Sequence, residues 1–240
     1  MDIQHVIDFD YHPSFSTMLI DHWRRFDANA IKKELICHKC ALQNANAVRI
    51  THSYDAYLRN PSLYLNRFEQ VLSICDSLGL GVISCLFNGW HDINMDCGGI
   101  YLEYLIPGFG WSWKEGFYGD FLTALCAKYA HDLRVILWET CNKPYGCFDH
   151  FINDDIHNHL YEKRWLREIY CFMKKAEVIQ PIGISVREWF PTDLMDEIAY
   201  SSDIMLISPY YCNAEKSKRI MAHPFDRERY PMLVIHDIDC

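Results

Sequence analysis

The sequence has no concentration of basic charge. Lysine and arginine number 23 against 32 aspartates and glutamates, the formal net charge is −9, and the basic residues are scattered in short groups such as Arg24-Arg25 and Lys174-Lys175. A protein that binds nucleic acid or an anionic membrane surface needs a basic face to neutralise phosphates. We therefore expect no nucleic-acid partner and no membrane partner.

Long apolar runs are also absent. A membrane-spanning helix needs about 18 or more consecutive apolar residues, and no stretch of the chain approaches that length. The N-terminus reads MDIQHVIDFDYHP, which is acidic where a signal peptide is basic. The 11 cysteines lie mostly in apolar periodic segments, as buried cysteines of a reducing compartment do. These features predict a cytoplasmic protein.

Motifs for metals and nucleotides are missing as well. Cys37 and Cys40 in CHKC have the spacing of zinc ligands, but no second pair lies nearby, so a zinc site is only an alternative. His91 and Asp92, with His52, show neither H-x-H nor H-E-x-x-H spacing. No G-x-G-x-x-G turn follows the first apolar run, which argues against a dinucleotide-binding sheet. We expect no metal and no cofactor.

What the chain does have is a regular alternation of short apolar runs and longer amphipathic segments. Strands that are apolar on both faces and separated by helices imply parallel pairing with right-handed crossovers. The runs predict strands at 5–10, 47–50, 81–87, 134–139, 182–186, 203–209 and 231–237. The amphipathic segments predict helices at 27–43, 60–80, 112–130, 159–178, 192–200 and 214–222.

The helix boundaries carry recognisable signals. Asp27 is placed to cap the first of these helices, and Asn60 to cap the second, with Pro61 in its first turn. Gly79 follows the second helix, where a left-handed residue often ends a helix.

Polar and aromatic residues follow nearly every predicted strand. A doubly wound sheet and a (β/α) barrel both fit the alternation, but polar strand ends all around the sheet are what a barrel active face needs. These residues are Tyr11-His12, Thr51-His52, Asn88-Trp90-His91, Asn142-Lys143, Arg187-Glu188-Trp189, Tyr210-Tyr211 and His236-Asp237. We predict an α/β fold, a (β/α)8 TIM barrel spanning 1–240 as a single domain, in which the eighth strand-helix unit is not seen.

Four strand ends carry a family resemblance. They read AVRI, W-E-T-C-N-K-P, S-P-Y-Y and Y-P-M-L-V-I-H. In this order they resemble the clan A glycoside hydrolases, retaining (β/α)8 enzymes of the cellulase and β-mannanase kind, that is, glycoside hydrolase family 5 and its relatives. The similarity runs from about Tyr11 to the last residue. It implies a carbohydrate, an oligo- or polysaccharide, as the partner.

The two catalytic positions of that family are substituted here. The family's fourth strand ends in Asn-Glu-Pro and this chain has Asn142-Lys143-Pro144, so the resemblance puts Lys143 at the acid/base position. It puts His236 at the nucleophile position. Retaining hydrolysis needs two carboxylates about 5 to 5.5 Å apart. A lysine, with an unperturbed pKa of about 10.4, and a histidine do not supply them.

The resemblance also implies a sugar-binding shell. Arg49 matches the arginine that orients the nucleophile, and Asn142 matches the asparagine that contacts the sugar 2-hydroxyl. Tyr210 matches a tyrosine of the sixth strand, whereas Ser208 stands where the family has histidine. Trp90 and three further tryptophans either stack on sugar rings or cover the barrel mouth. Arg49 fits a second role equally, as a buried arginine paired with a strand-end carboxylate.

Two functional interpretations follow. The first is a carbohydrate-binding degenerate glycosidase, and the loss of both catalytic glutamates favours it. The second is an active glycoside hydrolase that uses displaced carboxylates, with Glu139, Glu188, Asp237 and Asp239 as candidates. Fold resemblance alone does not decide between them.

Lys143 itself has two interpretations. We expect it to act as an electrostatic plug that pairs with Glu139, Glu188 or Asp237 at the barrel mouth. The alternative is a Schiff-base lysine, which requires a desolvated amine. The missing eighth unit would leave exposed sheet edges, so we also expect self-association into a homo-oligomer.

Overall fold

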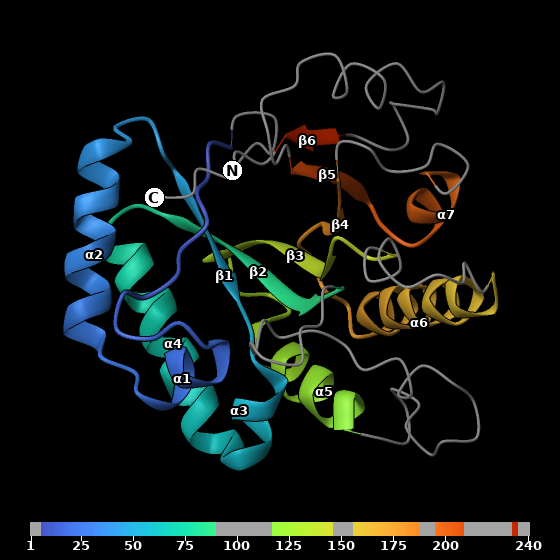
Figure 1. Cartoon of the computed structure of the whole chain (residues 1–240), viewed down its shortest axis with the longest axis horizontal. Coiled ribbons are helices and arrows are strands. Elements are labelled where there is room, and N and C mark those ends of the chain that lie inside the picture. The colour runs from blue at the N-terminus through green and yellow to red at the C-terminus, as the bar shows by residue number, and fades with distance from the viewer. Residues whose placement is uncertain (1–5, 90–116, 146–155, 188–194, 209–231, 235–240) are drawn as a thin grey trace.

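The computed structural model describes residues 6–89, 117–145, 156–187, 195–208 and 232–234, and Figure 1 shows a central sheet flanked by helices. The sheet contains six strands, β1 Ala47–Thr51, β2 Gly81–Asn88, β3 Val135–Asn142, β4 Ile182–Arg187, β5 Ile204–Ser208 and β6 Met232–Val234. The helices are α1 Leu19–Arg24, α2 Ala28–Ala41, α3 Tyr54–Arg59, α4 Pro61–Ser77, α5 Phe117–Tyr129, α6 Ile156–Lys175 and α7 Met195–Tyr200.

The strand order distinguishes the two architectures that the sequence allows. All six strands are parallel, and each lies beside its neighbour in sequence, from β1 to β6. A doubly wound sheet reverses its strand order at a switch point, whereas a barrel adds each strand next to the previous one. The predicted (β/α)-barrel fold is therefore confirmed as a partial barrel.

The first predicted strand, 5–10, lies beside β1. Arg49 N donates to Phe9 O at 2.9 Å, and Tyr11 N donates to Arg49 O at 3.2 Å. Asp10 and Arg49 form an isolated parallel bridge. This segment therefore extends the sheet past β1 and brings the Asp10 side chain to the interior face of the strand.

Alternation along the strands determines what fills the barrel. One buried apolar cluster is separate from the main core and consists of Val6, Ala47, Ile83, Leu137, Ile204 and Leu206. Side chains two residues apart on a strand point to the same face. Two residues after Ala47, Ile83 and Leu137, this face carries Arg49, Cys85 and Glu139. The interior thus changes from apolar to charged toward the carboxyl ends of the strands.

The predicted helix signals are confirmed. The Asp27 side chain accepts hydrogen bonds from the backbone N–H groups of Asn29 and Ala30 at 2.9 and 3.0 Å. Asn60 caps α4 by accepting from Leu63 N at 3.0 Å, and Gly79 has a left-handed φ of 66°. These short-range contacts explain why α2 and α4 begin and end close to their predicted limits.

Other boundaries differ from the predictions. The short helices α1 and α3 were not predicted, because six residues are too few to show helical periodicity. Ser53 is the signal for α3, since its hydroxyl accepts from Ala56 N at 3.2 Å. The strand predicted at 134–139 continues to Asn142 as β3. The helix predicted at 214–222 lies outside the described residues.

None of the helices in the described part of the chain is both long enough and apolar enough to cross a membrane.

Candidate functional site

A buried ion pair between Arg49 and Glu139 lies inside the barrel, close to the carboxyl ends of β1 and β3. Arg49 Nε lies 2.6 Å from Glu139 Oε2, and Arg49 Nη2 lies 2.8 Å from Glu139 Oε1. The side chains are 3% and 0% exposed. This is the bidentate geometry in which a guanidinium matches a carboxylate best.

Asp10 completes the coordination of Arg49. Arg49 Nη1 donates to both carboxylate oxygens of Asp10 at 2.9 Å. Burial by itself lowers the pKa of Arg49, but the negative charges of Asp10 and Glu139 raise it well above the ordinary arginine value. The arginine therefore stays charged, and it holds the N-terminal segment and β3 together through β1.

Ser185 on β4 connects this ion pair to the end of β3. Ser185 Oγ donates to Glu139 Oε1 at 2.5 Å and lies 3.0 Å from Asn142 Oδ1. Lys143 N donates to Ser185 O at 3.0 Å and lies 3.2 Å from Ser185 Oγ. Glu139 thus receives three hydrogen bonds from the described residues, and its side chain is 0% exposed.

The segment after β3 has an unusual backbone. Lys143 and Tyr145 have φ values of 53° and 60°, in the left-handed region that side chains other than glycine seldom adopt. Gly89 N donates to Asn142 O at 2.7 Å, and a Cβ on Gly89 would lie 2.5 Å from the Lys143 carbonyl oxygen. Only glycine lets the end of β2 approach this turn so closely.

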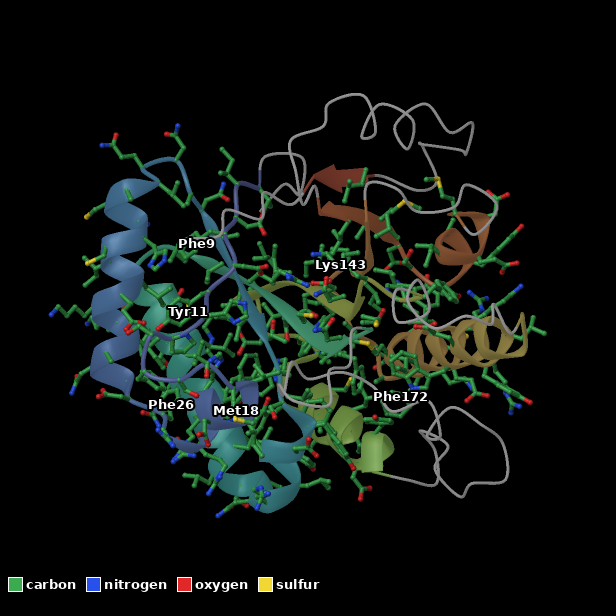
Figure 2. The ribbon with its side chains drawn as sticks, in the orientation of Figure 1. Phe9, Tyr11, Met18, Phe26, Lys143 and Phe172 are labelled. Carbon is green, nitrogen blue, oxygen red and sulfur yellow. The ribbon has the colours of Figure 1, made fainter. Side chains whose placement is uncertain are left out.

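Lys143 is a buried residue. Its side chain is 6% exposed, and Figure 2 shows it at the strand ends in the middle of the molecule. The ion pair that Glu139 makes is with Arg49, not with Lys143. Asn142, which precedes Lys143, donates a hydrogen bond from Nδ2 to Asn88 Oδ1 at 3.3 Å. Two half-buried side-chain amides therefore lie at the ends of β2 and β3, next to the lysine in the chain or in the sheet.

A buried glutamate on α6 supports this turn. Glu162 Oε1 accepts a hydrogen bond from Tyr145 N at 2.9 Å, while Glu162 Oε2 has no hydrogen-bond partner among the residues that the structure describes. Burial raises the pKa of Glu162 to about 7, although the bond from Tyr145 N acts in the opposite direction. Glu162 was missed by sequence reasoning because it follows no strand and belongs to no motif, and only its place on the buried face of α6 could have indicated it.

His52 follows β1 but lies away from the barrel mouth. Its Nδ1 is 2.7 Å from Tyr64 Oη, and its Nε2 is 2.7 Å from Ser84 Oγ. Trp23 stacks on the imidazole with 5.7 Å between the ring centroids. Burial lowers the pKa of His52 to about 3, so the ring is neutral. Both ring nitrogens are occupied by hydroxyl groups, which leaves neither of them for a metal.

The remaining candidates are distributed as follows. The backbone of Ser208 ends β5. Cys37 and Cys40 are exposed on α2, and no group of three or more potential metal ligands occurs among the residues that the structure describes. Trp90, His91, Asp92, Glu188, Tyr210, His236, Asp237 and Asp239 lie outside the described residues.

Comparison with known proteins finds similarity in structure but not in sequence. No protein-family model matches the sequence, and no curated protein matches it. A GH5_18 structure from Streptomyces cattleya in complex with GlcNAc superposes with a TM-score of 0.61 at 16% identity, over 90% of this chain and 54% of that one. The chain thus spans about half the length of that protein.

Two further solved structures are similar. An exo-β-1,4-mannosidase from Opitutaceae bacterium strain TAV5 has a TM-score of 0.61 at 14% identity, over 85% of this chain and 38% of that one. An endo-1,4-β-mannanase from Eisenia fetida has a TM-score of 0.61 at 13% identity, over 87% of this chain and 69% of that one. The expected resemblance to family 5 glycoside hydrolases is confirmed at the level of the fold.

Proposed function

We propose that the chain is a carbohydrate-binding protein built on a glycoside-hydrolase barrel, with a degenerate catalytic site. The observation that carries this proposal is the end of β3, where Lys143 directly follows Asn142 and is buried beside the interior network. In the resembling family that position holds the glutamate that protonates the leaving oxygen. The retaining mechanism uses a carboxylic acid for this step and a second carboxylate as the nucleophile, and a lysine is neither.

The environment of Glu139 supports a binding role over hydrolysis with a displaced carboxylate. A general acid or a nucleophile must present an oxygen to the sugar, but both oxygens of Glu139 are engaged by Arg49 and Ser185. Turning the carboxylate toward a substrate would leave a buried guanidinium without one of its two counter-charges. Such a loss costs several kcal/mol, about 3 to 5 when one partner of a buried pair is removed.

The groups at this strand end suit neutral sugar hydroxyls. Asn88 and Asn142 carry amides that donate and accept, and the Lys143 ammonium donates up to three hydrogen bonds. The similar GH5_18 structure from Streptomyces cattleya contains bound GlcNAc, which supports a carbohydrate as the ligand class here. We expect the ligand to be a β-linked gluco- or manno-configured oligosaccharide that is bound without cleavage.

Calorimetric titration tests this function. GlcNAc, cellobiose and mannobiose are titrated into the parent protein, into Asn142→Ala and into the matched control Asn66→Ala, which alters an exposed asparagine on α4. We expect binding of at least one sugar, about tenfold weaker in Asn142→Ala and unchanged in the control, since one lost hydrogen bond in a desolvated site is worth about 1.5 kcal/mol. Absence of binding in the parent, or equal weakening in both variants, would refute the proposal.

A further inference from the structure

A second site lies in the helical layer. A pocket of about 180 Å³, open to solvent, lies among α1, α3 and the first turns of α4, which are neighbours at the lower left of Figure 1. Its lining includes Arg24, Arg59 and Arg67, the aromatic residues Trp23 and Tyr64, and Asn60. It contains no residue of the strand-end site described above.

The charge of this pocket is one-sided. All of its charged lining residues are arginines, in a chain whose formal net charge is −9. Arg24 pairs with Asp21 only at 3.6 Å and is 54% exposed. Arg59 and Arg67 make no ion pair with any carboxylate in the described part of the chain. Three like charges around one hollow repel one another, and an anion bound between them would remove that repulsion.

Arg67 is held in place on the pocket wall. Its Nη1 donates to the carbonyl oxygen of Trp23, and its guanidinium lies 5.9 Å from the centroid of the Phe26 ring, a residue that Figure 2 labels beside α1. Burial lowers the pKa of Arg67. A fixed cation is thus partly desolvated, and the described part of the chain supplies no carboxylate that pairs with it, which is the arrangement expected of a site whose counter-ion is a ligand.

The helix beside the arginines adds to the positive potential. The 17-residue helix α4 starts at Pro61, and its N-terminal end, with Asn60 and Leu63, borders the pocket. The partial positive charge of a helix N-terminus favours anions. Trp23 and Tyr64 are 4% and 2% exposed and pack with their ring centroids 4.6 Å apart, which gives the pocket a rigid apolar floor.

We propose that this pocket binds a tetrahedral oxyanion, the phosphoryl group of a phosphorylated small molecule, between Arg24, Arg59 and Arg67. Guanidinium groups present forked donors that match phosphate oxygens, and several of them around one pocket favour a dianion over a single carboxylate. The aromatic floor would contact the uncharged part of the ligand. The site is independent of the carbohydrate site, because the two share no residue.

Titration by two-dimensional NMR tests the proposal with inorganic phosphate, inorganic sulfate and acetate as probes. Arg59→Gln removes an exposed pocket arginine, and Arg25→Gln is the matched control, since Arg25 is 68% exposed, pairs with Asp21 at 3.1 Å and does not line the pocket. We expect phosphate to shift amide signals of α3 and the start of α4, with affinity at least about tenfold weaker in Arg59→Gln and unchanged in Arg25→Gln. Arg59→Lys, which keeps the charge but not the fork, should fall between the parent and Arg59→Gln.

Three results would overturn the assignment. The first is no phosphate-dependent shift at the pocket in the parent, and the second is equal weakening by Arg59→Gln and Arg25→Gln, which would indicate screening of net charge. The third is acetate binding as tightly as phosphate, which would remove the preference for a dianion. Sulfate binding as tightly as phosphate supports the site for a tetrahedral dianion, because inorganic sulfate has the same shape and carries two negative charges.

Discussion

Two buried polar clusters lie on either side of the end of β3, and they differ in how completely their groups are paired. Inside the barrel, Arg49 joins Asp10 and Glu139 in ion pairs with short, bidentate contacts. On the helix side, one carboxylate oxygen of Glu162 has no hydrogen-bond partner in the described part of the chain, and the pKa of Glu162 is raised to about 7. The turn that it supports carries two left-handed residues other than glycine.

This difference separates the framework from the position where chemistry would occur. The interior network fixes three elements, the N-terminal segment, β1 and β3, independently of any substrate, so its retention does not require catalysis. Strain and an incompletely paired carboxylate instead accumulate at the turn that contains Lys143. Strained backbone and perturbed pKa values are typical of functional positions. We therefore propose that the turn is the functional part of the site and that the ion pair is its scaffold.

The largest effect should come from breaking the interior network. Glu139→Ala leaves Arg49 with one counter-charge fewer in a buried site, and we expect the free energy of unfolding to fall by about 3 to 5 kcal/mol. Urea denaturation measures it. Glu168→Ala is the control, because Glu168 pairs with Arg164 on the surface of α6 at 3.0 Å and should cost no more than about 0.5 kcal/mol. Similar losses in both variants would show that the network is not the scaffold.

The second effect concerns the pH dependence that Glu162 introduces. In the folded protein this carboxyl keeps its proton up to pH about 7, whereas in the unfolded chain it releases the proton near pH 4.5. Between these pH values the folded state binds more protons, so stability falls as pH rises. We expect Glu162→Gln to gain roughly 2 to 3 kcal/mol relative to the parent between pH 4 and pH 8.

Thermal melting of both proteins across this pH range provides the measurement. Glutamine keeps an oxygen that can accept from Tyr145 N but cannot ionise, so the variant isolates the ionisation. A stability difference between Glu162→Gln and the parent that stays constant from pH 4 to pH 8 would mean that Glu162 is not shifted, and the contrast between the two clusters would disappear.

The smallest effect compares two glycines. Gly89→Ala places a methyl group against the backbone of Lys143, which cannot move without displacing the turn, and we expect a loss of about 2 kcal/mol. Gly79→Ala is the control, because its left-handed φ costs roughly 1 kcal/mol and its Cβ meets only the flexible end of Lys39 at 3.4 Å. Equal losses by denaturation would show that the turn tolerates displacement.

The sequence predicts the parts of this molecule that depend on local patterns. Apolar runs locate the strands, caps such as Asp27 and Asn60 locate helix starts, and two-residue alternation puts Arg49 and Glu139 on one face. Local patterns do not predict Glu162 or the arginine pocket. Glu162 on α6 contacts the turn after β3 only in the folded chain, and the three arginines of the pocket come together only when α1, α3 and α4 pack. Residues in helices of six residues, such as Arg24 and Arg59, also belong to no periodic pattern.

The central claim is that the strand-end site binds carbohydrate but does not cleave it, and a turnover assay tests it most directly. The purified parent is incubated with aryl β-mannosides, aryl β-glucosides and β-1,4-glucans beside Glu188→Gln and Glu139→Gln. We predict that none of the three proteins releases product above the level of a heat-denatured sample. Turnover by the parent that is lost in a folded Glu188→Gln variant would contradict the claim and identify an active glycoside hydrolase with a displaced carboxylate.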